Sequence, residues 1–529
     1  MARLVDSDVL VLGSGGAGLR AAVEISEAGC RVSVVSKSPS GMNNATVVSG
    51  GGFHAAIEGV TIKEHLKETV DVGKNLNDPA LVKIFAKEGG ERVLELQKYG
   101  VKIRIKNGGA NIGEIPTLLG LALTKPMIEY AKGVGVEFLD NIIVTKLLKV
   151  ENRVVGAVGY DIHGEEPVVF QFKAVIIATG GAGAIYRRTD CPVRTTGDGY
   201  SLGLHAGAKL RDMEFVQFYP MALAEPGIPP YLLGETITEE GKIMNVLGDD
   251  IPSKYSLADH PLVLKSRDLL SRAVMLEIRQ GEGIDGSVLL DARSVFKNRS
   301  IDYITEGGTS RFLVEKLKAT EKPFRVAPIC HYCMGGIIID INGHTGVPGL
   351  YAAGEVVGGV HGANRQGGNA LTDILVFGKR AGSSAASYAL KHNTVDLDEL
   401  AKPEIKRYNA ILSRDHGYDG YAIIEKLKDV MWEKVGVIRD AISLADAFEE
   451  VYDLKLMADH VTVSNSRDML QALEASMSLE SAELIIRGAM ERRESRGAHY
   501  RTDYPNEDSK LVKPVIQIYS DTGAIKVQE

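Results

Sequence analysis

Cysteine is scarce in this chain, which has four cysteines among 529 residues. So few thiols argue against a disulfide framework and fit a protein that works in a reducing compartment. A conventional iron–sulfur cluster would use all four of them and leave none for anything else. Cys330 and Cys333 have C-x-x-C spacing, but no second pair completes a zinc site. We interpret them as packing residues and expect no metal.

Long apolar runs and basic blocks are also absent. No run approaches the roughly 18–20 residues that a membrane-spanning helix requires. The chain enters an apolar strand near Asp8 without the features of a signal peptide. With 61 basic and 69 acidic residues, the net charge is −8. We therefore expect a cytoplasmic protein, or one at the cytoplasmic face of a membrane complex, with no membrane span and no nucleic-acid partner.

The length and composition indicate several ordinary globular domains. A chain of 529 residues is too long for one core and suggests two to four domains. Apolar residues make up 44% and charged residues 25%, which is typical of globular proteins. A local cationic pocket for an acidic substrate remains compatible with the overall negative charge.

A glycine-rich turn near the N-terminus predicts a dinucleotide site. An apolar strand runs into Gly13-Ser14-Gly15-Gly16-Ala17-Gly18, and a helical pattern and a second strand, 31–36, follow. In this β-turn-α-β context the glycines let the backbone approach a pyrophosphate at the helix N-terminus. An NAD site would have an acid after the second strand, whereas this chain has Ser36-Lys37. FAD is therefore favoured over NAD; a glycine turn that binds nothing is the weaker alternative.

Two later apolar strands predict that the cofactor domain is discontinuous. The segment 174–184 precedes Thr196-Gly197-Asp198-Gly199, and a third unit lies near 349–371. We expect an α/β fold: a Rossmann-like FAD-binding domain of residues 1–225 and 330–392, an inserted α+β capping domain of 226–329, and a C-terminal helical domain of 393–529. In the last part, apolar residues recur at helical spacing in 404–412, 420–435, 444–459 and 469–492.

Imidazole and guanidinium donors for an anionic substrate occur together between residues 328 and 378. The stretch reads PICHYCMGG and then HGANRQGGNALTD, which places His331 and His361 to Arg365 on turns between apolar segments. A lone histidine near a glycine pair is more often a core residue than a ligand. Because His331 occurs together with the HGANR segment, a substrate site is favoured.

On these residues, and on Ser266-Arg267-Asp268, the chain resembles the flavoprotein subunit of the succinate dehydrogenase and fumarate reductase family over nearly its whole length. L-Aspartate oxidase is a relative of that family. The resemblance implies that Arg267 donates a proton to the substrate, and that His331 and Arg365 clamp its carboxylates. The cofactor-binding residues predicted from the motifs and the resemblance are Gly13, Gly15, Gly16, Ala17, Gly18, Ser36, Lys37, Ala45, Thr46, Gly51, Gly52, Ala178, Thr179, Gly180, Asp198, Glu355, Asn369, Ala370 and Leu371.

Arginine is an unusual acid, because its ordinary pKa exceeds 12. Arg267 can donate a proton only if nearby cations and a dry site make that proton available as hydride arrives. The alternative is that Arg267 simply begins a helix and forms a salt bridge.

The chain departs from the resembled family in several places. Membrane-bound members attach FAD through a histidine where this chain has Ala45, so we expect FAD to be non-covalent, with a lower potential that favours fumarate reduction. The family's Phe-His-Pro is Phe218-Tyr219-Pro220, and Tyr219 can donate a hydrogen bond but carries no charge. Glu235 matches the family's carboxylate-binding and relay acid only with a one-residue gap, and the relay arginine is missing near Ile237 and Thr238. The family's Thr-Gly-His is absent from 118–127.

These observations support one main hypothesis and two alternatives. The first is a flavoprotein subunit that reduces fumarate, or oxidises succinate, by hydride transfer at FAD N5, and its electron partner is an iron–sulfur subunit. The second is a relative that acts on another dicarboxylate or enoate, as L-aspartate oxidase does. The third is a flavin protein with an altered pocket that transfers electrons or acts as a scaffold. The charged segment 492–508 is a further family signature, to which we assign no chemistry.

Overall fold

A five-stranded parallel sheet draws its strands from three distant parts of the chain. The computed structural model describes residues 2–113, 119–257, 261–263, 266–300, 309–520 and 523–528. The strand order is β18-β11-β2-β3-β7, and the strands are β18 (Leu350–Ala352), β11 (Ala174–Ile177), β2 (Val9–Leu12), β3 (Val32–Ser36) and β7 (Glu137–Asp140). Four of these strands are short apolar runs that are almost wholly buried, as expected for a parallel sheet covered by helices, whereas the edge strand β7 is partly exposed. The predicted α/β class is confirmed.

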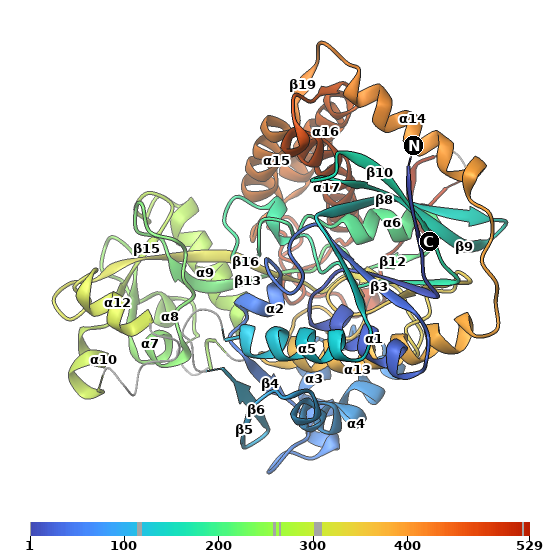
Figure 1. Ribbon diagram of the computed structural model, residues 1–529. Coiled ribbons are helices and arrows are strands. Elements are labelled where there is room, and N and C mark those ends of the chain that lie inside the picture. Colours follow the sequence, from blue (N-terminus) through green and yellow to red (C-terminus); the bar gives the residue numbers. More distant parts are fainter. Residues whose placement is uncertain are drawn as a thin grey trace.

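Two helices that start at glycine-rich turns pack together beside this sheet. Helix α1 (Gly16–Glu27) follows β2, and the long helix α13 (Asn369–Ala389) follows the HGANR region. Gly378 and Gly382 of α13 would each place a Cβ 2.7–2.8 Å from a carbonyl oxygen of α1, so glycine permits the close approach. Figure 1 shows both helices lying below the sheet. Their N-terminal ends therefore lie in the same part of the domain.

The N-terminal half adds further elements around this centre. A second sheet has the order β1-β10-β9-β8 and pairs β1 (Arg3–Asp6) in parallel with β10 (Glu166–Gln171), which continues antiparallel into β9 (Arg153–Asp161) and β8 (Ile142–Val150). The other elements of this half are α2 (Ala45–Val48), β4 (Gly52–His54), α3 (Ile62–Val72), α4 (Pro79–Glu95), β5 (Ile103–Lys106), β6 (Gly109–Ile112), α5 (Leu121–Gly133) and α6 (Asp198–Ala206). Leu118, at the start of the segment that lacks Thr-Gly-His, lies outside the described residues.

A separate lobe is formed by described elements between residues 216 and 333. The bounds 226–329 of the capping domain stay a prediction. The sheet of this lobe has the order β13-β16-β15-β14, from β13 (Val216–Leu223), β16 (Phe324–Cys333), β15 (Val288–Asp291) and β14 (Lys242–Met244). Its helices are α7 (Glu235–Glu240), α8 (Ile251–Lys254), α9 (Arg267–Arg279), α10 (Arg293–Asn298) and α12 (Thr309–Glu315). The lobe has its own apolar core, which includes Ile243 and Leu270. The strands β13 and β16 extend from it into the main body (Figure 1).

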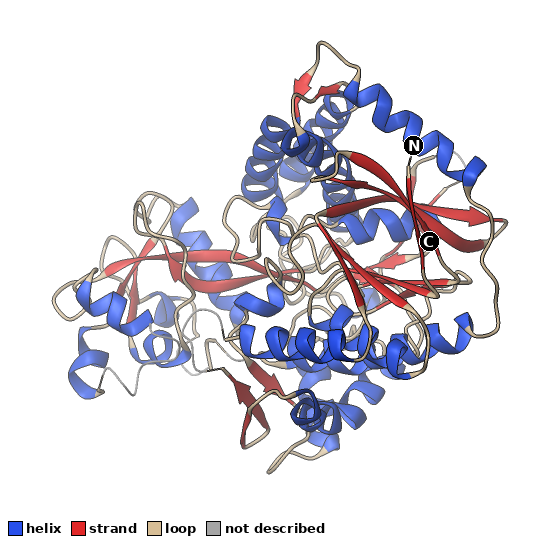
Figure 2. Cartoon of the chain, in the orientation of Figure 1, coloured by secondary structure: helices blue, strands red, loops and turns tan. Residues whose placement is uncertain are grey.

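The C-terminal part begins with four helices and ends with strands. The helices are α14 (Asp398–Leu412), α15 (Gly420–Val435), α16 (Ala441–Ala458) and the largely buried α17 (Ser466–Glu491). All four predicted helical segments are present, although α14 starts six residues earlier than the sequence pattern and includes Pro403. Figure 2 shows these helices grouped at the top of the view. After α17 the chain forms β21 (Ile516–Tyr519) and β22 (Ile525–Gln528), which join β12 (Leu210–Arg211) and β17 (Gly336–Ile337) in one sheet. The predicted C-terminal helical domain is thus confirmed, and two short strands that we did not predict follow its last helix.

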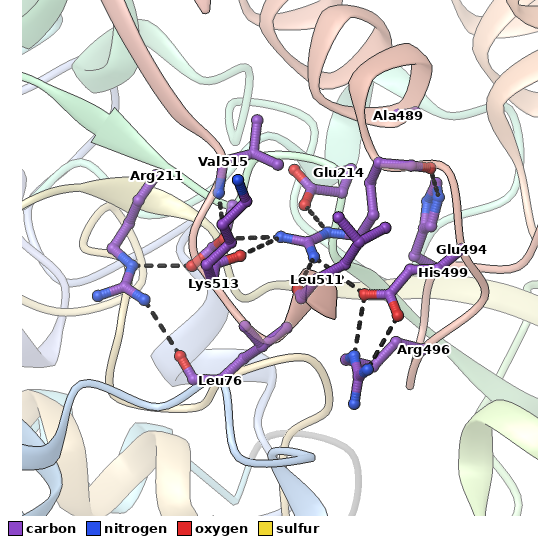
Figure 3. Close-up of polar contacts among 12 residues, drawn as sticks. Leu76, Arg211, Glu214, Ala489, Glu494, Arg496, His499, Leu511, Lys513 and Val515 are labelled. Carbon is purple, nitrogen blue, oxygen red and sulfur yellow. Dashed lines mark hydrogen bonds and ion pairs between the residues drawn. The ribbon is translucent and has the colours of Figure 1, made fainter. Parts of the chain in front are cut away.

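A buried ionic cluster fastens this last segment to the main body (Figure 3). The Arg492 guanidinium donates to carboxylate oxygens of Glu214 at 2.5 Å, Glu494 at 3.0 Å and Asp212 at 3.2 Å. It also donates to the main-chain carbonyls of Leu511 and Lys513. With five donors bound, the cation is fully satisfied despite its burial. Because Asp212 and Glu214 immediately precede β13, the cluster fixes the point where that strand begins.

No helix in the described part of the chain is both long enough and apolar enough to cross a membrane.

Candidate active site

A cavity of about 1020 Å³ connects the carboxyl end of the parallel sheet with the capping lobe. Every predicted cofactor-binding residue lines it except Gly18 and Asn369. Tyr219, Glu235, Arg267, His331 and Arg365 also line it. The structure thus brings the predicted nucleotide-binding and substrate-binding residues into one continuous space. The volume suits a dinucleotide, since ligand pockets typically measure about 300–1,000 Å³.

The first glycine turn has the close approaches that a pyrophosphate site requires. Gly13 has a φ of +110°, and a Cβ there would lie 2.3 Å from the carbonyl oxygen of Ala178. A Cβ at Gly18 would lie 1.9 Å from the carbonyl oxygen of Gly13, so Gly18 packs helix α1 against the turn instead of lining the cavity. The helix N-terminus, at Gly16, faces the cavity and favours an anion there.

Lys37, which takes the place of the acid of an NAD site, lies among carboxylates. Its Nζ is 2.8 Å from Asp198 Oδ2 and 2.9 Å from Glu474 Oε1, and it donates to Thr196 Oγ1 at 2.8 Å. Burial opposes the charge, but Asp198 and Glu474 raise the pKa of Lys37 above its ordinary value. Asp198, predicted to bind the cofactor, therefore also neutralises Lys37. Sequence reasoning missed Glu474, which comes from α17.

Glu355 is a buried carboxyl group in the wall of the cavity. One of its oxygens accepts the Cys333 N–H at 3.0 Å. Burial raises the pKa of Glu355 to about 7, despite the backbone hydrogen bonds and Arg365, which lower it. A carboxyl group with such a pKa can donate a hydrogen bond to a ligand hydroxyl near neutrality. Its contact with the ribityl chain stays a prediction.

Asn369 begins α13, but its side chain has internal partners. The amide donates to Thr69 Oγ1 at 3.0 Å, and its Oδ1 lies 3.1 Å from His65 Nε2. Ala370 and Leu371, the next residues, line the cavity. Asn369 therefore holds α3 against α13, and any contact with the cofactor would come from its main chain.

Arg267 is buried at the start of α9 and faces the cavity. Its Nε donates to the Val263 carbonyl oxygen at 2.7 Å, and its Nη1 lies 3.5 Å from Gln217 Oε1. Among the described residues no carboxylate forms an ion pair with it. Burial lowers its pKa, and the more distant Asp190 and Glu235 only partly offset this. The structure therefore supplies the dry surroundings that an arginine acid requires.

Arg365 is a second buried guanidinium in the same cavity. Its Cζ lies 4.6 Å from the centroid of the Tyr332 ring, its Nη1 donates to the Gln366 carbonyl oxygen at 3.3 Å, and its Nε has no partner. Burial, followed by repulsion from Arg267, lowers its pKa to about 10. Within the described ranges it also has no ion pair with a carboxylate. An anionic ligand would offset both unfavourable effects.

His331 is held by a carboxylate that sequence reasoning missed. Its Nδ1 lies 2.7 Å from Asp190 Oδ2. Burial lowers the pKa of His331, although Asp190 opposes the shift. If Nδ1–H is donated to Asp190, Nε2 can donate to a substrate carboxylate only when the imidazole is protonated. Asp190 thereby fixes the ring orientation.

Tyr219 lies where expected, but its hydroxyl has a protein partner. The hydroxyl donates to the Leu233 carbonyl oxygen at 2.7 Å, and the ring centroid is 5.6 Å from that of His331. We expected the Tyr219 hydroxyl to donate to the substrate. Here it donates to the main chain of Leu233, within the segment 232–235. Tyr219 as a whole still lines the cavity.

The capping helix α7 carries Glu235 but no arginine. Glu235 is its first residue and lines the cavity. Ile237 and Thr238, near the position expected for the relay arginine, are both buried and uncharged. Another cation, Arg311 of α12, also lines the cavity, and sequence reasoning did not single it out.

Cys330 and Cys333 are buried, and all four cysteines are free thiols. Burial raises the pKa of both, to about 12 for Cys333. In the described part of the chain no three metal-ligating side chains gather into a metal site.

The fold and this cavity define an FAD-dependent oxidoreductase. Residues 8–371 match the FAD binding domain family, and residues 424–528 match the fumarate reductase flavoprotein C-terminal family. The chain is 35% identical to one of the subunits of the fumarate reductase (CoM/CoB) of Methanothermobacter marburgensis, covering 95% of each chain. It is 31% identical to the L-aspartate oxidase of Yersinia pestis, covering 95% of this chain and 96% of the other. Among solved structures, a quinol–fumarate reductase with menaquinol superposes with a TM-score of 0.90 at 27% identity, covering 99% and 98%. The chain belongs to the family of succinate dehydrogenase and fumarate reductase flavoprotein subunits.

Proposed function

We propose that this chain reduces the double bond of fumarate, or of a related enoate, with Arg267 as the proton donor. The observation that carries the proposal is the pair of buried guanidiniums, Arg267 and Arg365, which face one cavity without a carboxylate partner among the described residues. The same cavity has the glycine turn of the FAD-binding domain. A bound carboxylate would stabilise both cations and place the substrate beside the flavin.

The residues of the chain divide the work as follows. Arg365, together with protonated His331, binds the carboxylate conjugated to the double bond and draws electron density toward it. FAD, when bound and reduced, supplies a hydride to one alkene carbon. Arg267 donates a proton to the neighbouring carbon, so that one hydride and one proton complete the two-electron reduction. The low dielectric of the buried site makes that proton easier to release.

We further propose that FAD is bound without a covalent link. Ala45 lines the cavity at the position where the resembled membrane-bound enzymes have their histidine, and a methyl group cannot form that bond. Acid precipitation of the purified protein should leave the flavin in the supernatant. Flavin that remained with the precipitate would contradict this assignment.

Electrons must also reach the flavin, and we propose that their source is an iron–sulfur subunit. The proposal follows from the family to which the chain belongs. We propose that the complex works in the cytoplasm or at the cytoplasmic face of a membrane. Co-purification of the chain under native conditions should recover a protein whose iron content matches its acid-labile sulfide.

The altered capping side favours a second candidate, a substrate other than fumarate. The Tyr219 hydroxyl is donated to Leu233, and α7 has no basic residue. Another enoate, or the iminoaspartate used by an L-aspartate oxidase-type enzyme, would suit a site with a changed clamp. A non-catalytic scaffold is the remaining alternative, although three retained side chains, Arg267, His331 and Arg365, speak against it.

One assay distinguishes these functions. The flavin is reduced without oxygen, then mixed with fumarate, a panel of enoates or iminoaspartate, and its reoxidation is followed by absorbance. Rapid reoxidation by fumarate that Arg267→Ala abolishes would support the main proposal. Arg293→Ala is the matched control, because Arg293 also begins a helix of the capping lobe but is exposed at its surface. Reaction with another acceptor alone would support the second candidate, and no reaction would support a scaffold.

A further inference from the structure

A buried amide network joins the two elements that carry Arg267 and Arg365. Gln217 of β13 has no exposed surface, and Asn364 is 2% exposed. The Gln217 Nε2 donates to Asn364 Oδ1 at 2.7 Å and to the Arg365 carbonyl oxygen at 2.8 Å. Its Oε1 is 3.5 Å from the Arg267 guanidinium. Gln217 is therefore in contact with both sides of the site.

Asn364 completes this network with a direct bond to the capping helix. Its Nδ2 donates to Asp268 Oδ1 at 3.1 Å. Asn364 immediately precedes Arg365, and Asp268 immediately follows Arg267, so one hydrogen bond connects the neighbours of the two guanidiniums. Both groups are almost fully buried, and a buried bond between an amide and a carboxylate is stronger than one exposed to water.

The C-terminal segment supports both ends of this connection. The Ala498 N–H donates to the Ala363 carbonyl oxygen at 2.9 Å, next to Asn364. On α9, the Arg272 guanidinium lies 4.1 Å from the centroid of the Tyr500 ring. The C-terminal segment thus contacts both the loop that carries Asn364 and helix α9. The hydrogen bond between Asn364 and Asp268 fixes the position of that loop relative to α9.

We propose that Asn364 is a positioning residue that places Arg267 against Arg365 through its bond to Asp268. The inference rests on the proposed function, because it assigns Asn364 a role in proton transfer from Arg267. Asn364 does not itself touch the substrate. It fixes the first turn of α9, and a displacement of about 1 Å at that point is enough to slow such a reaction on the order of 100-fold.

The substitution Asn364→Asp tests the bond because it makes the connection depend on pH. Two carboxyl groups would then face each other, with Arg272 and Lys74 as the other charged groups near Asp268. At low pH one shared proton restores a donor between them, whereas at high pH both are ionised and repel. Burial already raises the pKa of Asp268, so the shared proton should persist above the ordinary carboxyl range.

The chain also offers a matched rescue, the exchange Asn364→Asp with Asp268→Asn. In this double variant Asn at position 268 donates to Asp at position 364, which still accepts from Gln217. Every donor and acceptor of the network is retained, and no second carboxylate remains. We expect Asn364→Asp to slow flavin reoxidation by fumarate on the order of 10- to 100-fold at pH 8, with most of the loss recovered near pH 5.5. The exchanged variant should stay close to the wild-type rate at both values.

A second measurement separates this inference from the function on which it rests. Amide hydrogen exchange in the first turn of α9 is compared among the FAD-loaded wild type, Asn364→Asp and the exchanged double variant. All three are measured at the same pH and without substrate. Faster exchange in Asn364→Asp at pH 8, with slow exchange in the exchanged variant, supports the connection even if no enoate reoxidises the flavin. Equal exchange in all three proteins overturns it. The inference is also overturned if flavin reoxidation by Asn364→Asp has the same pH dependence as in the wild type. A purely structural defect would lower stability without changing the pH dependence of the rate.

Discussion

The guanidinium of Arg267 lies over the ring of Tyr219, with its Cζ 4.9 Å from the ring centroid. The aromatic face attracts the cation without neutralising it, as a carboxylate would. Arg267 is thus held in place and still keeps a proton to donate. This contact gives Tyr219 a role that its hydroxyl, which bonds to Leu233, does not have.

The Tyr219 contact predicts that the ring matters more to the reaction than the hydroxyl. Tyr219→Phe keeps the ring and leaves the Leu233 carbonyl oxygen without its donor. The free energy of unfolding should fall by about 1–3 kcal/mol. We expect its flavin reoxidation rate to stay within about threefold of wild type. Tyr219→Leu removes the cation–π contact, worth about 2 kcal/mol when desolvated, and should slow the rate at least tenfold. Equal rates for both variants would show that the ring does not position Arg267.

The pairing of His331 with Asp190 predicts that a dicarboxylate binds more tightly at low pH. Burial lowers the pKa of His331 from 6.5, so the imidazole gains its charge only as the pH falls below that value. Asp190→Asn removes the carboxylate that raises this pKa, and the binding transition should move to a lower pH. Absorbance titration of the oxidised flavin with succinate between pH 5 and 8 measures the dissociation constant. Affinity that rises with pH would contradict the assignment.

The carboxylates around Lys37 predict that its charge is essential for the FAD site. In Lys37→Met the buried Asp198 loses its ion pair, whereas Glu474 keeps a second one with Arg194 at 2.6 Å. The unpaired Asp198 carboxylate should lower the free energy of unfolding by about 3–5 kcal/mol. The variant should have a lower melting temperature and retain less FAD after gel filtration. Lys173→Met is the control, because Lys173 pairs with Asp8 in a more exposed position. A larger loss of FAD in the control would refute the prediction.

The ionic cluster around Arg492 predicts a strong requirement for the arginine fork. Arg492→Lys keeps one charge but cannot make five directed bonds, so buried acceptors lose their donors. We expect a destabilisation of about 3 kcal/mol or more, measured as a fall in melting temperature. The neighbouring Arg493 is exposed, and Arg493→Lys should leave the melting temperature unchanged. Similar melting curves for both variants would mean that the cluster contributes little.

The sequence predicts the local features of this protein well, because they depend on neighbouring residues. The Gly13–Gly18 turn follows a strand and opens a helix, as its pattern indicates. The start of a helix was harder to predict. Helix α14 begins at Asp398 and continues through Pro403, although a proline ordinarily interrupts a helix. The strands β21 and β22 were missed because β21 pairs with β12, which lies about 300 residues earlier, and β22 pairs in turn with β21.

The missed site residues are those whose role depends on long-range pairing. Asp190 lies 141 residues from His331, and Glu474 lies 437 residues from Lys37. Nothing in their local sequence distinguishes them from surface acids. In the sequence alone, an acid that stays exposed cannot be told from one that pairs with a buried cation. Only the fold shows which acid lies beside a cation.

The distance along the chain between Lys37 and Glu474 has a consequence for how the protein acquires its cofactor. During synthesis, the ribosome completes the glycine turn, Lys37 and Asp198 long before it reaches α17. Until that helix docks, Lys37 in the wall of the nucleotide site has only one of its two carboxylate partners. We therefore expect stable FAD binding to come late in folding, in chains whose C-terminal part is already in place.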